Sequence, residues 1–401
     1  MSYYQAISWR RVMSARDPDE PHRASTPLEL LFDLCFVVAV SQAAAQYHHA
    51  LAQGHAGTGV LGYLMVFFAI WWAWMNFTWF ASAYDTDDIP YRLLTLLQMA
   101  GVLVLAAGAA SALADYDFTV ITVGYVLMRV AMVGQWLRAA VEHPAGRAVA
   151  LRYATGIAVA QVGWTVRLAL PHPLDYVGFV VLAVTEIAVP IWAEHRRSPI
   201  SWHPGHIVER YGLFTLIVLG EAILGSFTGI QSALSEHGLS VPVLLIAVGG
   251  LVLVFALWWT YFTGVDSKLS STWIAMTWGY GHYLVFAATA AVGAGLDVAV
   301  DAAAHADRVP PGPAALAVTL PVALFVPALA FLHRMTDTGA VGHPLLVAGG
   351  TVVVFGLGFT TGWWGIGGTV LAVGLATGAL LAANLMVTGR RARAHAAIQM
   401  P

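Results

Sequence analysis

The sequence has 401 residues, of which 59% are hydrophobic and 10% are charged, and its mean hydropathy is +0.71. This composition excludes a soluble globular protein and predicts a chain that crosses a membrane several times. The net charge of −3 is spread thinly between apolar segments, so the sequence offers no basic patch for nucleic acid, and the single cysteine, Cys35, excludes a disulfide framework.

Apolar segments of about 20 residues, the length that a helix needs to cross the hydrocarbon core, occur about twelve times along the chain. We therefore predict an all-α polytopic membrane protein with about twelve transmembrane helices. In chain order these helices are predicted at 28–47, 59–81, 92–114, 118–141, 149–170, 175–193, 207–231, 240–264, 273–296, 312–333, 343–361 and 364–388.

Arginine and lysine residues give the orientation, because cytoplasmic loops carry an excess of positive charge. They gather before the first predicted helix, after every second helix and at the C-terminal end, and the clearest groups are Arg10 to Arg23, Arg138 to Arg152, Arg196 with Arg197, and Arg390 to Arg393. Both termini are therefore predicted to be cytoplasmic. No apolar segment precedes Arg23, so we expect no cleavable signal peptide.

The stretch LELLFDLCFVVAVSQ in the first helix aligns with HIVERYGLFTLIVLGEAILG in the seventh, which places Glu29 on Glu209. Trp71 and Trp258 then follow in matching helices. This order predicts a 6+6 internal duplication, with residues 1–195 as the first six-helix repeat and 196–401 as the second. Because six is even, the halves would share one orientation in the membrane, as in parallel transporter repeats.

Ionisable residues within the predicted helices are candidates for function, because a charge at mid-membrane costs at least ~2.5 kcal/mol. Glu29 and Asp33 are four residues apart and share one helix face, so one of them should hold a proton unless a cation intervenes. The alternative for Glu29 is a hydrated helix cap behind Thr26 and Pro27.

On the seventh predicted helix, Arg210 and Glu221 are eleven residues apart and lie within about 20° on the same face. Glu221 falls near mid-membrane and is the strongest single candidate for proton binding. The alternative is a protonated glutamate at a packing contact beside Gly220 and Gly225. Glu209 and Arg210 are either part of the same site or a local ion pair.

Arg129 and Glu186 are deep charges of opposite sign, and their pairing would make either a structural clamp or a substrate-anion site on Arg129. His282 is a candidate proton carrier, with a buried core histidine as the alternative.

The tryptophans at 71–79 and 258–259 are interpreted as an interfacial aromatic belt, and DTDD at 85–88 as a hydrated acidic loop. HPGHIVE at 203–209 lacks the spacing of a zinc helix, so neither metal nor cofactor is predicted.

Four motifs, TPLELLFDLCFVVAVSQ, WWAWMNFTWFASAYDTDD, HIVERYGLFTLIVLGEAILG and WGYGHYLVF, together resemble the LtrA family, named for low temperature requirement. The resemblance extends over essentially the whole chain. It implies a bacterial multi-pass inner-membrane protein, and it transfers no catalytic or binding residue, because the family name records a growth trait.

The leading hypothesis is a proton- or ion-coupled secondary transporter of a small solute, with Glu221 and Asp33 as protonatable groups and Arg210 as a gating partner. An enzyme is not expected, because the sequence offers no nucleophile–base group. One alternative is a six-plus-six-helix ion channel, since FDLCFVVA resembles the first helix of the two-repeat lysosomal potassium channels. The other is a non-transporting membrane protein that supports growth at low temperature. The expected partners are the lipid bilayer, a proton or small ion and a small solute; the oligomeric state stays open.

Overall fold

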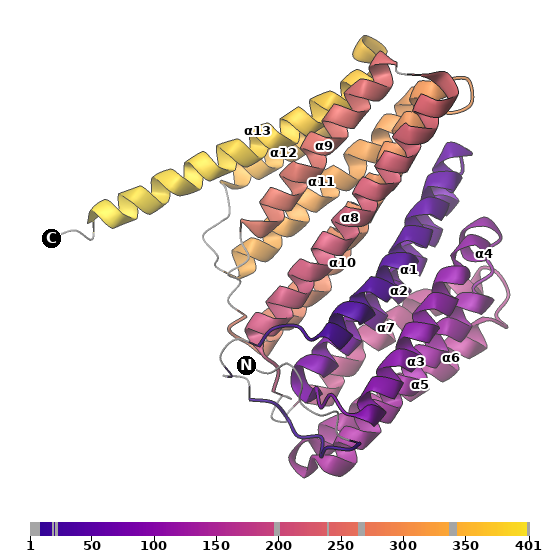
Figure 1. Ribbon diagram of the computed structural model, residues 1–401, viewed down its shortest axis with the longest axis vertical. Coiled ribbons are helices and arrows are strands. Elements are labelled where there is room, and N and C mark those ends of the chain that lie inside the picture. The colour runs from indigo at the N-terminus through magenta and orange to yellow at the C-terminus, as the bar shows by residue number, and fades with distance from the viewer. Residues whose placement is uncertain are drawn as a thin grey trace. The chain divides into compact units, whose positions relative to one another are not determined.

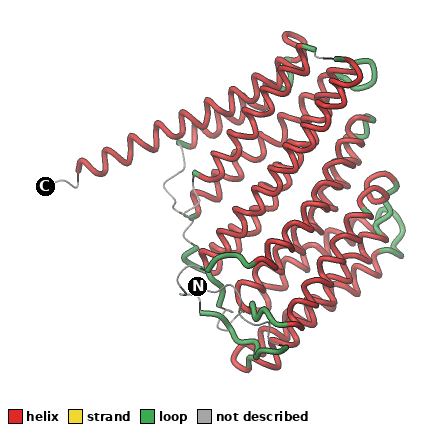
Figure 2. The backbone as a smooth tube through the Cα atoms, viewed as in Figure 1, coloured by secondary structure: helices red, strands yellow, loops and turns green. Residues whose placement is uncertain are grey.

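The computed structural model describes residues 9–17, 20, 23–195, 201–238, 240–263, 269–336 and 343–398 (Figure 1). The regular structure of these residues is helical throughout, as Figure 2 shows. In chain order the helices are α1 (Pro27–Ala52), α2 (Ala56–Tyr84), α3 (Ile89–Ala107), α4 (Ala109–Ala114), α5 (Thr119–Glu142), the 3₁₀ turn η1 (Pro144–Gly146), α6 (Arg147–Arg167), α7 (Leu174–Glu194), α8 (Pro204–His237), α9 (Val241–Phe262), α10 (Thr272–Ala304), α11 (Pro311–Met335), α12 (Pro344–Leu357) and α13 (Thr361–Ile398).

Each predicted membrane segment falls on a helix, with the third divided into α3 and α4 at Gly108. In the described part of the chain, 10 helices are long and apolar enough to cross a membrane. The predicted segments at 149–170 and 343–361 do not meet that test, because α6 is too weakly apolar and α12 has only 14 residues. The all-helical, multi-pass membrane fold is confirmed; ten of the described helices meet the length and composition of a span, and the count of twelve stays a prediction.

The chain divides into two compact units. Unit 1 comprises residues 1–43 and 65–211, and unit 2 comprises residues 44–64 and 212–401. The helices α1, α2 and α8 each contribute one part to unit 1 and the other part to unit 2. The duplication with its boundary at 195 and 196 stays a prediction, and Arg196, Arg197 and Asp266 lie outside the described residues.

In unit 1, α3 packs on α5, α5 on α6, and α6 on α7. The contact between α3 and α5 is made by backbone, since a Cβ atom at Gly124 would lie 2.4 Å from the amide nitrogen of Leu105. Small residues allow such close packing in a membrane, where lipid removes the hydrophobic drive between helices. This packing brings the polar side chains of α5 and α6 against those of α2 and α7.

In unit 2, α10 packs along α11, and α9 along α13. A Cβ atom at Gly295 of α10 would lie 2.2 Å from the carbonyl oxygen of Ala317 in α11. This carbonyl lacks the amide donor of an ordinary helix, because the residue four positions later is Pro321. Gly295 therefore lets α10 cover a polar group that a proline has released.

We predict that a reporter fused after His55, between α1 and α2, is external, and that one after Ala145, between α5 and α6, is cytoplasmic. The reason is the arginine asymmetry of the connections. Paired alkaline phosphatase and fluorescent protein fusions measure both positions. A cytoplasmic signal at position 55 or an external one at 145 contradicts the orientation; position 199 lies outside the described residues.

Candidate functional site

A cluster of buried charged side chains lies in unit 1, where α1, the first turns of α8 and the connection after α2 meet. We call it the charge cluster. None of its side chains is more than 4% exposed, and its members are Arg23, Glu29, Asp33, Asp85, His206 and Arg210. Three predicted site residues, Glu29, Asp33 and Arg210, therefore lie together.

The shortest ion pair of the charge cluster joins α8 to α1. Arg210 Nη2 donates to Asp33 Oδ1 at 2.5 Å, and the indole Nε1 of Trp74 donates to the same oxygen at 2.8 Å. Arg210 Nη1 also lies 3.8 Å from Glu29 Oε1. A cation thus lies between the two carboxylates of α1, which is the condition under which both remain ionised.

Glu29 begins α1 with a capping box. Its Oε2 accepts the N–H of Thr26 at 2.8 Å, while its own N–H donates to Thr26 Oγ1 at 3.3 Å. The predicted cap is confirmed, but the predicted hydration is wrong, because the Glu29 side chain is 1% exposed and its Oε1 lies 3.1 Å from His206 Nε2. The cap therefore turns a carboxylate toward α8.

Arg23 covers the end of α2. Its guanidinium donates to the carbonyl oxygens of Ser82 and Ala81 in the last turn of α2, where Ala81 O also accepts the N–H of Asp85 at 3.2 Å. Its Nη2 atom lies 3.8 Å from both Glu29 Oε1 and Asp85 Oδ2. Arg23 thus joins the segment before α1 to the carboxylates of Glu29 and Asp85.

Asp85 is the first residue after α2. Burial raises the pKa of Asp85 to about 6 and the charge of Glu29 adds to this rise, while Arg23 and Arg16 oppose it. The interpretation of DTDD as a hydrated loop is wrong for Asp85 and for Asp88, whose buried side chain caps α3 and binds Arg138 at 2.6 Å. Only Asp87 keeps substantial exposure, at 43%, beside Arg92.

Several buried polar atoms of the charge cluster form no hydrogen bond within the described residues. Two are acceptors, Asp33 Oδ2 and Glu29 Oε1, and two are the ring nitrogens of His206. The others are donors from Arg23 Nε, Arg210 Nε and Nη1, and the neighbouring Tyr91 hydroxyl. Water satisfies donors and acceptors together, so this mixture suits bound water or a hydrated proton better than a simple ion.

The remaining candidate of this region is half-buried. Glu209 accepts the N–H of Ser25 at 3.2 Å. The alternative of a local Glu209–Arg210 ion pair is wrong, because Arg210 turns to Asp33 instead. Glu209 therefore holds the segment before α1 against α8.

Glu186 of α7 lies in a second polar group of unit 1. Its carboxylate accepts hydrogen bonds from Trp72 (2.7 Å), Tyr125 (3.1 Å), Gln161 (3.1 Å) and Trp164 (3.2 Å), and Arg129 Nη2 lies 3.5 Å away. The predicted pairing is confirmed. With its acceptor positions occupied and Arg129 also donating to Tyr125 at 2.6 Å, the arrangement is that of a clamp joining α2, α5, α6 and α7.

The aromatic-belt interpretation is wrong for three of the four tryptophans of α2. Trp71, Trp72 and Trp74 are at most 2% exposed, and the last two donate to the carboxylates of Glu186 and Asp33. Trp258 and Trp259 of α9 are 44% and 53% exposed, as a belt requires.

Unit 2 contains a line of three acids, Glu221 on α8 and Asp297 and Asp301 on α10, which we call the acidic ladder. His48 Nε2 lies 2.7 Å from Asp301 Oδ2, at the more exposed end. One turn away, the Asp297 carboxylate lies against glycines of α8, since a Cβ atom at Gly225 would be 2.9 Å from its Oδ2. Glu221 is a further turn along α8, and its charge acts on Asp297. Of these residues, only Glu221 was predicted from the sequence as a proton-binding residue.

His282 of α10 has both ring nitrogens occupied. Nδ1 lies 2.7 Å from the carbonyl oxygen of Trp278, and Nε2 lies 3.2 Å from the Tyr261 hydroxyl. The imidazole is 1% exposed and packs between aromatic rings. The structure favours the buried core histidine over the proton carrier.

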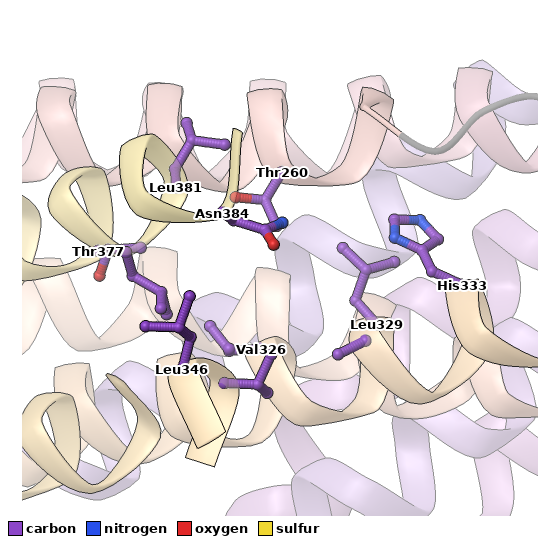
Figure 3. A pocket seen from close by; sticks show the side chains of 11 residues that line it. Thr260, Val326, Leu329, His333, Leu346, Thr377, Leu381 and Asn384 are labelled. Carbon is purple, nitrogen blue, oxygen red and sulfur yellow. The ribbon is translucent and has the colours of Figure 1, made fainter. Parts of the chain in front are cut away.

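A pocket of about 40 Å³ in unit 2 lies among α9, α11, α12 and α13 (Figure 3). Thr260 and Thr377 in its wall donate their hydroxyl protons to Ala256 O (2.7 Å) and Val373 O (2.8 Å), so these hydroxyls could offer a bound molecule only an acceptor. His333 and Asn384 are the other polar members of a wall that is otherwise aliphatic. This lining suits a small molecule that donates hydrogen bonds.

We predict that Asp33→Asn and Arg210→Gln each lower the free energy of unfolding by roughly 3–5 kcal/mol, because each leaves a buried charge without its partner. The double variant should lose much less than the sum. Thermal unfolding in detergent gives the double-mutant cycle. Arg10→Gln, which breaks a pair whose arginine is 66% exposed, serves as the matched control and should have little effect. Additive losses in the double variant would contradict the pairing.

We predict that the stability of the folded protein depends on pH through Asp85. Because its pKa rises from 3.8 to about 6 on folding, the folded state binds a proton that the unfolded chain releases, and this stabilisation is lost as the pH rises through that window. Asp85→Asn mimics the protonated form and should flatten the decline in melting temperature between those values. Asp87→Asn is the control; an unchanged profile in Asp85→Asn refutes the assignment.

The model of the family described as bacterial low temperature requirement A protein (LtrA) matches residues 24–388. A protein of Rhizobium meliloti (strain 1021), "Uncharacterized protein RA0937", is 29% identical to this chain over 278 residues. That similarity covers 65% of this chain and 65% of the relative, so the chain spans slightly less than two thirds of the relative's length. The family match includes the charge cluster from Glu29 onward, the Glu186 clamp and the acidic ladder. The chain belongs to the bacterial low temperature requirement A (LtrA) family.

Proposed function

We propose that this protein is a proton-coupled secondary transporter of a small solute in the bacterial inner membrane. The observation that carries the proposal is the acidic ladder, in which Glu221, Asp297 and Asp301 follow one another along two membrane-length helices. The charged groups that act on Asp297 are His48, Asp301 and Glu221, and neither arginine nor lysine is among them. Protons are therefore the counter-charge available to this group.

The energetics of burial support this step. Carboxylates within a membrane helix must be neutralised by a partner or by protonation, because an isolated charge in low dielectric is too costly. His48 pairs with Asp301 and its charge also acts on Asp297, so a single imidazole serves both of these carboxylates. At least one acid of the ladder would hold a proton in one stage of a transport cycle and release it in another.

The order of exposure along the acidic ladder supports a path for that proton. Asp301 and His48 have side chains 40% and 27% exposed, so they exchange protons with solvent. Asp297, more deeply buried, has an Oδ1 atom without a hydrogen bond in the described residues, and Glu221 lies beyond it. The proton would pass from Asp301 through Asp297 to Glu221.

The charge cluster of unit 1 has a different part in the proposal. Arg210 and Trp74 already stabilise the ionised form of Asp33, so the protonatable role passes from Asp33 to Asp297 and Glu221. Arg210 keeps the role of a gating partner, because its ion pair joins α8 to α1 and would have to break if these helices separated.

The pocket of Figure 3 is the candidate solute site of the proposal. Its acceptor-only threonines, with His333 and Asn384, favour a small uncharged solute that donates hydrogen bonds, such as an amide or a polyol. No feature of the described residues favours the ion-channel or the non-transporting alternative over transport.

We predict that purified protein in proteoliposomes moves protons when a gradient of its solute is imposed. The panel would include urea, glycerol, small amides and small amino acids, with an internal pH dye as the readout. Glu221→Gln fixes the neutral state, so it should reduce solute-driven proton movement roughly tenfold or more. Glu236→Gln, an exposed glutamate on the same helix, is the matched control.

Three outcomes would overturn the proposal. Full coupling in Glu221→Gln with an unchanged pH profile would make Glu221 a packing residue. Ion flux that needs no solute would show a channel. Absence of solute and ion flux from well-folded wild-type protein would favour the non-transporting alternative.

A further inference from the structure

Arg167, the last residue of α6, is a buried cation that was not predicted from the sequence as a site residue. It is 3% exposed, and its guanidinium carbon lies 4.8 Å from the ring centre of Phe118, 5.3 Å from that of Phe179, and 6.0 Å from those of Tyr116 and Trp164. These distances are within the range of cation–π attraction. Aromatic rings stabilise a cation but supply no counter-charge.

The guanidinium forms only two hydrogen bonds in the described part of the chain. Nε donates to the carbonyl oxygen of Asp175 at 3.0 Å, and Nη2 donates to the Tyr116 hydroxyl at 3.2 Å. The carboxylate of Asp175 turns elsewhere, accepting the N–H of Tyr176 at 2.9 Å and lying 3.3 Å from His172 Nδ1. Nη1 of Arg167 therefore has no hydrogen bond among these residues.

Arg167 differs in this respect from the other buried arginines of the described residues. Arg23, Arg129 and Arg210 each have a carboxylate oxygen within 3.8 Å. Arg167 has none within the 4.0 Å of an ion pair. A buried guanidinium remains charged at any physiological pH, so its compensation must come from an anion rather than from loss of a proton.

A small pocket adjoins this cation, between α2, α5, α6 and α7. Its volume is about 20 Å³, and its wall includes Arg167, the hydroxyl-bearing residues Thr122 and Tyr125, and the rings of Phe68, Phe118 and Phe179. A space of roughly 10–15 Å³ accommodates one water molecule, so this pocket holds one small ion and excludes a larger solute.

The surroundings of the pocket admit a negative charge. Glu186 lies on the other side of Tyr125 and Trp164, but Arg129 and four neutral donors already compensate its charge. The edges of aromatic rings are electropositive, so the ring-lined wall does not repel an anion that approaches from an edge.

We propose that the pocket beside Arg167 binds one small monovalent anion, of the size of a halide. The inference does not depend on proton coupling, because the site lies in unit 1 and involves no residue of the acidic ladder. The anion would neutralise the Arg167 guanidinium and fix the ends of α6 and α7 against α5.

Chloride is the probe for this site. The melting temperature of the purified full-length protein should rise saturably when chloride replaces gluconate at constant ionic strength, because a ligand that binds the folded state stabilises it. Arg167→Gln should reduce the apparent chloride affinity roughly tenfold or more, since charge-assisted hydrogen bonds are lost. Arg308→Gln, which removes an arginine that is 78% exposed, should respond to chloride as the wild type does.

The proposal is overturned if wild-type protein melts at the same temperature in chloride and gluconate, or if Arg167→Gln keeps the full chloride response. If Arg167→Gln does not fold, Arg167→Lys keeps the positive charge and should retain a weaker response. Crystals of wild-type protein in bromide give a direct test, in which an anomalous peak beside the guanidinium supports the site and its absence there refutes it.

Discussion

The ion pair between Arg210 and Asp33 is the contact on which the arrangement of unit 1 depends. It joins the first turns of α8 to α1, and Trp74 ties the same carboxylate to α2. Glu29 and His206 lie around this pair, and Arg23 brings the preceding segment over them. The charges of this group are held in place because any one of them, left alone in a membrane helix, would be too costly to bury.

Unit 2 also buries ionisable groups whose charge needs compensation, but its groups are arranged differently. Its acidic ladder has an imidazole at its exposed end, and in our proposal protons that come and go supply the rest of its counter-charge. Packing favours this arrangement, because Gly225 and Gly229 let Asp297 lie against the backbone of α8. Fixed ion pairs in one unit and exchangeable protons in the other are the reason for assigning proton coupling to Glu221 and Asp297 rather than to Asp33.

The sequence predicts what depends on short-range periodicity. Hydropathy locates every helix, and the spacing of Glu29 and Asp33 indicates a shared face, because helical geometry relates residues a few positions apart. Long-range partners give no such signal. Trp72 and Trp74 resemble belt residues in the sequence, although they donate to Glu186 of α7 and to Asp33 of α1, and DTDD resembles a solvated loop, although Arg138 of α5 binds Asp88. The count of twelve spans stays a prediction, because α6 is less apolar than the other long helices and α12 has only 14 residues.

The identity of the counter-charge decides what each buried ionisable group is able to do. Arg129 has a fixed counter-charge, the carboxylate of Glu186, whose acceptor positions are filled. This pair is a clamp that holds helices together. We propose that protons supply the counter-charge of the acidic ladder, so its carboxylates are able to change charge during a transport cycle. Arg167 has neither, since its guanidinium cannot release a proton and the described chain offers it aromatic rings in place of a carboxylate. A mobile anion is the counter-charge that remains, and the adjoining pocket is large enough for one.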